Sequence, residues 1–167
     1  MLEFYYKGMK NMQYITRYMD DDILKEIISW KYEGEYKEYN LEPYETLVER
    51  NSSIIQLEKR DNYLCYFIEE EFIGYTNVVK KPNGELFLGI GLAPKHCGKG
   101  YGSSILNNSI NEAMKKHPDS KITLQVRSWN IRAIKCYEKS GFIITKKEKV
   151  QDRNGIETEF GFMEYEK

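Results

Sequence analysis

The sequence predicts an α+β fold, in which about four helices flank a mixed, mostly antiparallel sheet of about seven strands. Two observations predict this class. Strand-like segments follow one another in the middle of the chain and again at its end. One long helical segment, preceded by a glycine-rich turn, connects two strands as a crossover. We expect a single domain over residues 1–167, with residues 1–11 as an extra or disordered N-terminal segment.

The elements of the first half are predicted from caps, turns and alternation. Asp20 is placed to cap a helix with an acidic first turn, which complements the helix dipole. Pro43 stands at a first-turn position that a helix tolerates. The predicted order is a strand at 13–18, helices from 20 and from 43, hairpin strands at 62–68 and 72–80 joined by an acidic tip, and a strand at 85–92.

The second half contains two further helices and three strands. Apolar residues at helical spacing follow the glycine-rich turn, and basic residues before Pro118 mark the end of that helix. Asn130 is placed to cap a short helix, and Asn154-Gly155 is typical of a hairpin turn. The predicted order is a helix to about 117, a strand at 122–126, a helix at 130–139, and strands at 142–150 and 156–165.

Composition excludes several classes of function. Hydrophobic residues are 41% and charged residues 31% of the chain, as in soluble globular proteins. The net charge of −1 disfavours a nucleic-acid partner. Three widely spaced cysteines and two histidines form no zinc pattern and indicate a reducing compartment. Neither a membrane-spanning apolar run nor a secretion signal is seen, so we expect a cytoplasmic protein without a membrane partner.

The stretch 88–105, LGIGLAPKHCGKGYGSSI, joins a strand end to a helix start through glycines at positions 98, 100 and 102. Glycines let the backbone approach a ligand closely, and the first helical turn adds unpaired N–H donors. This pattern predicts a phosphate-binding loop. The order of elements and the missing acidic residue exclude the NAD fingerprint. The missing G-K-[ST] ending excludes a nucleotide-triphosphate loop.

The loop APKHCGKGYGSSIL and the downstream segment WNIRAIKCYEKSGF form a pair of motifs. The first is similar to the acetyl-CoA motif of the GCN5-related N-acetyltransferase (GNAT) family, Gln/Arg-x-x-Gly-x-Gly/Ala. The second matches that family's Asn-x-x-Ala-x-x-x-Tyr-x-x-x-Gly-Phe helix. The resemblance, which covers about residues 13–167, implies the GNAT-like acyl-CoA N-acyltransferase fold. It implies transfer of acetyl from acetyl-CoA to an amine without a metal, and a homodimer is one assembly to expect of such enzymes.

The resemblance also implies roles for individual residues. Backbone groups of the strand would hold the pantetheine arm and polarise the acetyl carbonyl, and N–H groups of the loop would bind the pyrophosphate. Tyr137 occupies the position of the family's proton donor, where a neutral phenol can protonate the leaving thiolate; its alternative role is packing in the core. The implied cofactor-binding residues are Ile90, Gly91, Leu92, Cys97, Gly98, Lys99, Gly100, Tyr101, Gly102, Ser103, Asn130 and Tyr137.

Two positions depart from the family's pattern. Cys97 stands where the family has Gln or Arg, so backbone N–H groups must supply the contacts to phosphate. A reactive thiol is the alternative role of Cys97, while the adjacent His96 is expected at the surface. Many members carry a glutamate inside the strand, whereas Glu85 stands one residue from that position. Glu85 is therefore one candidate base, beside water and the tyrosines and glutamates of residues 30–45.

The segment between the first two helices combines aromatic and acidic residues. From Lys31 to Arg50 there are six glutamates and three basic residues. Trp30 and Tyr32 either cover the core or line an acidic, aromatic wall for a cationic amine. The acceptor is expected to be a small-molecule amine or a protein amino group, and the glutamates favour a cationic small molecule. The alternative function is a non-catalytic acyl-CoA-binding or sensing domain, against which the retained Tyr137 argues.

Overall fold

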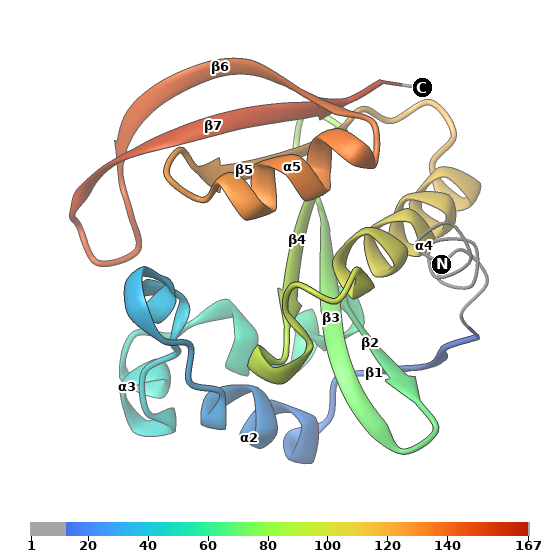
Figure 1. The fold of residues 1–167 in the computed structure, drawn as a ribbon. Helices are drawn as coiled ribbons and strands as arrows, with labels where there is room; N and C mark the ends of the chain where they lie inside the picture. The colour runs from blue at the N-terminus through green and yellow to red at the C-terminus, as the bar shows by residue number, and fades with distance from the viewer. Residues whose placement is uncertain (1–12, 167) are drawn as a thin grey trace. The chain divides into compact units, whose positions relative to one another are not determined.

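A computed structural model describes residues 13–166, so the prediction for residues 1–11 lies outside the described part of the chain. A seven-stranded mixed sheet with the order β1-β2-β3-β4-β5-β7-β6 confirms the predicted fold class (Figure 1). The β4–β5 pair is parallel, whereas β1–β2, β5–β7 and β6–β7 are antiparallel. The strands are β1 (Ile15–Tyr18), β2 (Tyr63–Ile68), β3 (Glu71–Lys80), β4 (Leu86–Leu92), β5 (Ile122–Arg127), β6 (Phe142–Gln151) and β7 (Glu157–Tyr165).

The helices begin where the predicted caps place them. The Asp20 carboxylate accepts a hydrogen bond from the Ile23 N–H at 2.8 Å, and the Asn130 side chain accepts one from the Ala133 N–H at 3.0 Å. The α-helices are α2 (Asp21–Ser29), α3 (Tyr44–Glu49), α4 (Tyr101–Lys116) and α5 (Ile131–Lys139), and short 3₁₀ turns include η1 (Gly34–Tyr39) and η4 (Pro94–His96). Within the described residues, no helix has the length and apolar character needed to cross a membrane.

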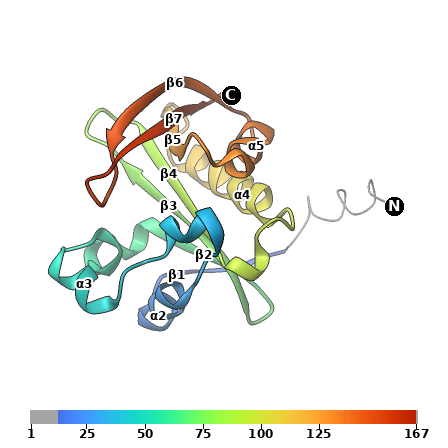
Figure 2. The same ribbon diagram turned by 60° about the vertical axis from the view of Figure 1, so that its left-hand side comes forward.

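The chain divides into two compact units, and strands β3 and β4 pass from one to the other. The first unit holds the chain up to Thr76 together with Gly91–Tyr101. Its core joins the apolar face of α2 to β2, since Leu24 and Ile27 belong to the same buried cluster as Cys65 (Figure 2). The single domain expected over residues 1–167 stays a prediction.

The second unit holds Asn77–Ile90 and the chain from Gly102 onward. Its core joins α4 and α5 to one face of the sheet. Strand residues alternate between faces, so the even-numbered residues 86 and 88 of β4 and 122–126 of β5 are buried there, and the residues between them face the other way. The buried cluster includes Leu86, Leu88, Leu106, Ile110, Ile122, Leu124, Phe142 and Met163.

A buried ion pair fixes the turn of the β6–β7 hairpin. The Arg127 guanidinium lies 2.8 Å from the Asp152 carboxylate, and their side chains are 7% and 5% exposed. The second carboxylate oxygen of Asp152 accepts hydrogen bonds from the N–H groups of Asn154 and Ile156. The hydrogen bond from Arg127 is the main cause that holds the pKa of Asp152 below its usual value of 3.8, and the backbone hydrogen bonds act in the same direction.

Replacing Asp152 with alanine should lower the melting temperature by several degrees at neutral pH, because it leaves the Arg127 charge buried without its partner. The lowered pKa means that the carboxylate stabilises the fold above pH 3.8 and that this stabilisation is lost as the pH falls below 3.8. Thermal unfolding followed between pH 3 and pH 7 measures both effects. Glu148→Ala is the control, because its pair with Lys146 is about half exposed and should contribute little.

Candidate active site

The glycine-rich loop between β4 and α4 has the backbone that its sequence predicts. Cys97 follows the η4 turn, and Gly98 and Gly100 have φ angles of +75° and +87°. Residues with a side chain rarely adopt this left-handed conformation, so both positions require glycine. When residues in the left-handed conformation alternate with residues in other conformations, successive backbone N–H groups point to one side of the chain. The loop then leads directly into α4 at Tyr101.

In the first unit, aromatic side chains gather against the end of β4. The Tyr32 hydroxyl donates a hydrogen bond to the Leu92 carbonyl at 2.7 Å. Trp30 stacks on Tyr75 with ring centroids 6.0 Å apart. Of the two predicted acceptor residues, Tyr32 therefore contacts the strand segment predicted to hold the thioester, whereas Trp30 contacts Tyr75 of the neighbouring strand. Trp30 is 8% exposed and belongs to the core, so its role in packing is confirmed, and its role in acceptor binding stays a prediction.

Two glycines allow this arrangement. A Cβ atom at Gly91 would lie 2.6 Å from the Tyr75 ring, and a Cβ atom at Gly74 would lie 2.4 Å from the Gly91 carbonyl oxygen. Tyr75 is a neighbour of the site that the sequence analysis missed. The available signal was a glycine inside each of two adjacent strands, which marks a close approach of backbones.

In the second unit, β4 and β5 separate after two residues. Their parallel register pairs Leu86 with Ile122 and Phe87 with Thr123. No pairing with β5 is found for residues 88–90 of this unit, although both strands continue. The strand edges beyond Phe87 therefore present backbone groups that an extended ligand could hydrogen-bond, as an added strand would.

The second unit also brings the start of α4 to α5. The Ser103 hydroxyl lies 3.4 Å from the Cys136 thiol, and Tyr137 follows Cys136 on α5. Burial raises the pKa of Cys136, so its thiol is a packing group and not an activated nucleophile. The Tyr137 ring is half-buried and lies edge-on to Phe142, with centroids 6.3 Å apart. The packing of Tyr137 in this core is thus confirmed, while its role as proton donor stays a prediction.

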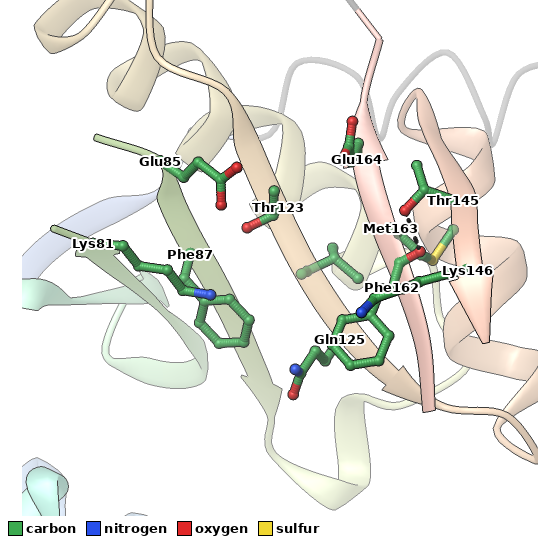
Figure 3. Close-up of a pocket in the computed structure, with 11 residues that line it drawn as sticks. Lys81, Glu85, Phe87, Thr123, Gln125, Thr145, Lys146, Phe162, Met163 and Glu164 are labelled. Atoms are coloured by element: carbon green, nitrogen blue, oxygen red, sulfur yellow. Dashed lines mark hydrogen bonds between the residues drawn. The ribbon is translucent and has the colours of Figure 1, made fainter. Parts of the chain in front are cut away.

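Glu85 lies apart from Tyr137. It lines a hollow of about 170 Å³ on the sheet face that carries Phe87 and Thr123 (Figure 3). Tyr137 packs against the buried cluster on the opposite face of this sheet. The hollow is smaller than typical ligand pockets of about 300–1,000 Å³, so it can hold only part of a ligand.

His96 is buried, with 5% of its surface exposed, so its expected place at the surface is wrong. The η4 turn directs the ring inward, where it packs against Tyr101. Cys97 is half-buried, and its thiol donates a long contact of 3.8 Å to the Ala93 carbonyl. Among the described residues, no group of three or more histidine, cysteine or acidic side chains could hold a metal ion.

One family model matches most of the chain. The model of the acetyltransferase (GNAT) family matches residues 23–142. No curated protein sequence matches the chain significantly.

Three solved structures show the extent of the likeness. The spermidine/spermine N-acetyltransferase SpeG from Vibrio cholerae is 22% identical with a TM-score of 0.67, and the match covers 93% of each chain. The ribosomal-protein-S18-alanine N-acetyltransferase from Escherichia coli is 18% identical with a TM-score of 0.64, over 92% of this chain and 93% of its own. A GNAT acetyltransferase from Streptococcus pneumoniae is 17% identical with a TM-score of 0.61, over 91% and 98%.

Replacing Gly91 with alanine should destabilise the protein by about 1–3 kcal/mol, because the new methyl group would overlap a Tyr75 ring that Trp30 holds in place. Urea unfolding measures this loss. Gly89→Ala is the control in the same strand, where the nearest atoms belong to Asn77 at 3.9 and 4.0 Å. Equal stability of the two variants would contradict the close packing of Tyr75 on Gly91.

Proposed function

The chain belongs to the acetyltransferase (GNAT) family, and we propose that it moves acetyl from acetyl-CoA to a primary amine by direct attack. The nitrogen of the neutral amine forms a bond to the acetyl carbon, and the bond from that carbon to sulfur breaks. Tyr137 gives its phenolic proton to the departing sulfur, which restores neutral coenzyme A thiol. The observation that supports this proposal is the contact of Ser103 with Cys136, which brings α5, the helix that carries Tyr137, against the first turn of α4.

The backbone supplies most of the proposed contacts to coenzyme A. The separated strand edge around residues 90–92 holds the pantetheine arm, and the N–H groups from Cys97 to Ser103 bind the pyrophosphate. The positive φ angles of Gly98 and Gly100 support this use of the loop, and Lys99 between them adds a charge. Binding is proposed to survive Cys97 at the position of the family's Gln or Arg, because N–H donors do not depend on the side chain. Asn130 caps α5 and contacts the pantetheine arm in the proposed complex.

The proton of the attacking amine needs a separate acceptor. Glu85 stays one candidate for this role, although it lies on the sheet face opposite to Tyr137. Water and the tyrosines and glutamates of residues 30–45 are the other candidates.

A cationic small molecule is the proposed acceptor. The hydrogen bond from Tyr32 to Leu92 ties the glutamate-rich segment to the strand that holds the thioester. One structurally similar enzyme is named for spermidine and spermine, and another for the alanine of a ribosomal protein. A panel of polyamines, amino acids and peptides with a free amino group therefore tests the proposal. Release of free thiol from acetyl-CoA with at least one of these amines is the expected result.

Tyr137→Phe should lower kcat at least several-fold, and by up to about 10²-fold, because the thiolate would leave without its proton donor. Its dissociation constant for acetyl-CoA should change less than twofold, since the ring still packs on Phe142. Thiol release at saturating substrates and calorimetric binding measure the two effects. Tyr165→Phe is the control, because it removes a hydroxyl from the other tyrosine that packs on Phe142. Unchanged turnover in Tyr137→Phe would exclude the proposed acid.

Gly100→Ala should weaken acetyl-CoA binding by about tenfold or more, because alanine disfavours the φ angle of +87° and distorts the loop. Gly84→Ala is a matched control: its φ angle is +85° and no atom lies within 4 Å of the added methyl group. Both variants should lose similar stability in thermal unfolding. Equal affinity of both variants for acetyl-CoA would argue against the phosphate-binding role of the loop.

A further inference from the structure

We propose that His96 is a positioning residue for acetyl-CoA binding, because its ring closes the phosphate-binding loop by packing against Tyr101. The inference rests on the proposed role of this loop. His96 ends the η4 turn and Tyr101 begins α4, so the two rings bracket residues 97–100. Their centroids are 5.3 Å apart and their planes meet at 81°, which is an edge-to-face contact.

The η4 turn is itself anchored to the start of β3. The Lys95 ammonium lies 2.6 Å from the Glu71 carboxylate, and the Ala93 N–H donates a hydrogen bond to the Ile73 carbonyl at 3.0 Å. The contact between His96 and Tyr101 links this anchored turn to the start of α4, at the other end of the loop. A loop with glycines at positions 98 and 100 has high backbone freedom, and fixing both of its ends reduces the entropy that ligand binding must remove.

His96 acts by packing and not by charge. Its side chain is 7% exposed, and its Nε2 atom lies 3.4 Å from the Glu71 carboxylate. Within the described residues, neither ring nitrogen makes a hydrogen bond of good geometry. Burial is the main cause that lowers the pKa of His96 below its usual 6.5; Lys95 and Lys99 lower this pKa further, while Glu71 opposes them. The ring is therefore neutral at pH 7 and adds no charge to the phosphate site.

Two substitutions distinguish the effect of the aromatic ring from the effect of its polar atoms. His96→Phe keeps an aromatic ring against Tyr101, whereas His96→Gln keeps polar atoms near Glu71 and loses the ring. His96→Gln should raise the dissociation constant and the KM for acetyl-CoA by about threefold to tenfold, with kcat within twofold of the wild type. His96→Phe should bind within twofold of the wild type. Tyr101→Leu should weaken binding like His96→Gln, and the double variant should be no weaker than either alone.

Calorimetric binding of acetyl-CoA to the wild type and these variants tests the inference. Wild-type affinity in both His96→Gln and Tyr101→Leu would overturn it, as would weak binding by His96→Phe. If Gly100→Ala weakens binding while the ring variants do not, the positioning role fails and the proposed loop stands. If the wild type does not bind acetyl-CoA, the proposed function fails and this inference fails with it.

A pH series tests whether the ring is buried and neutral. Because the pKa is lowered by folding, the wild type should lose stability as the pH falls below about 6.5, when the buried ring must take up a proton. The neighbouring charged and titratable groups, Glu71, Lys95, Lys99 and Tyr101, are unchanged in His96→Phe. The melting temperature of the wild type should therefore fall relative to His96→Phe between pH 7.5 and pH 5.5. If the difference in melting temperature between the wild type and His96→Phe stayed constant over this pH range, the ring would not be buried and neutral.

Discussion

The backbone of β4 is the constraint on which the site depends. Its first residues, Leu86 and Leu88, place their side chains in the core of the second unit. Its last residues lie in the first unit, where Tyr32 binds the Leu92 carbonyl and Tyr75 covers Gly91. The separation from β5 after Phe87 leaves the strand edge with groups that no neighbouring strand pairs in the second unit. One strand thus contributes to two cores, and its main chain is the part proposed to bind a ligand.

A site that binds phosphate through the main chain, as proposed for the loop, would tolerate an unusual side chain there. Cys97 stands where the GNAT family has Gln or Arg, yet the left-handed angles of Gly98 and Gly100 are kept. Those angles depend on the missing Cβ atom at each glycine, and the N–H groups that they orient belong to every residue. Substitutions of these glycines should therefore disturb the loop more than substitutions of Cys97.

The sequence predicted the elements well because their signals are local. Asp20 and Asn130 cap helices through hydrogen bonds to residues three positions along, and Asn154-Gly155 forms a turn from adjacent residues. The glycine-rich loop was predicted for the same reason. The burial of His96 was predicted wrongly, and the packing of Tyr75 on Gly91 was missed. Both depend on contacts between segments whose distance in space does not follow from their spacing along the chain. The pair of Arg127 and Asp152, 25 residues apart, belongs to the same class.

The contact of Tyr75 with Gly91 links two positions in evolution. A side chain at position 91 fits only if the ring at position 75 is replaced by a smaller group, because the two would occupy the same volume. Neither change is favourable alone: the first creates an overlap, and the second opens a cavity beside Trp30 and Tyr63. Related sequences should therefore carry either a glycine with an aromatic ring or a larger residue with a small partner. Lineages that pass from one pair to the other must cross a less stable intermediate.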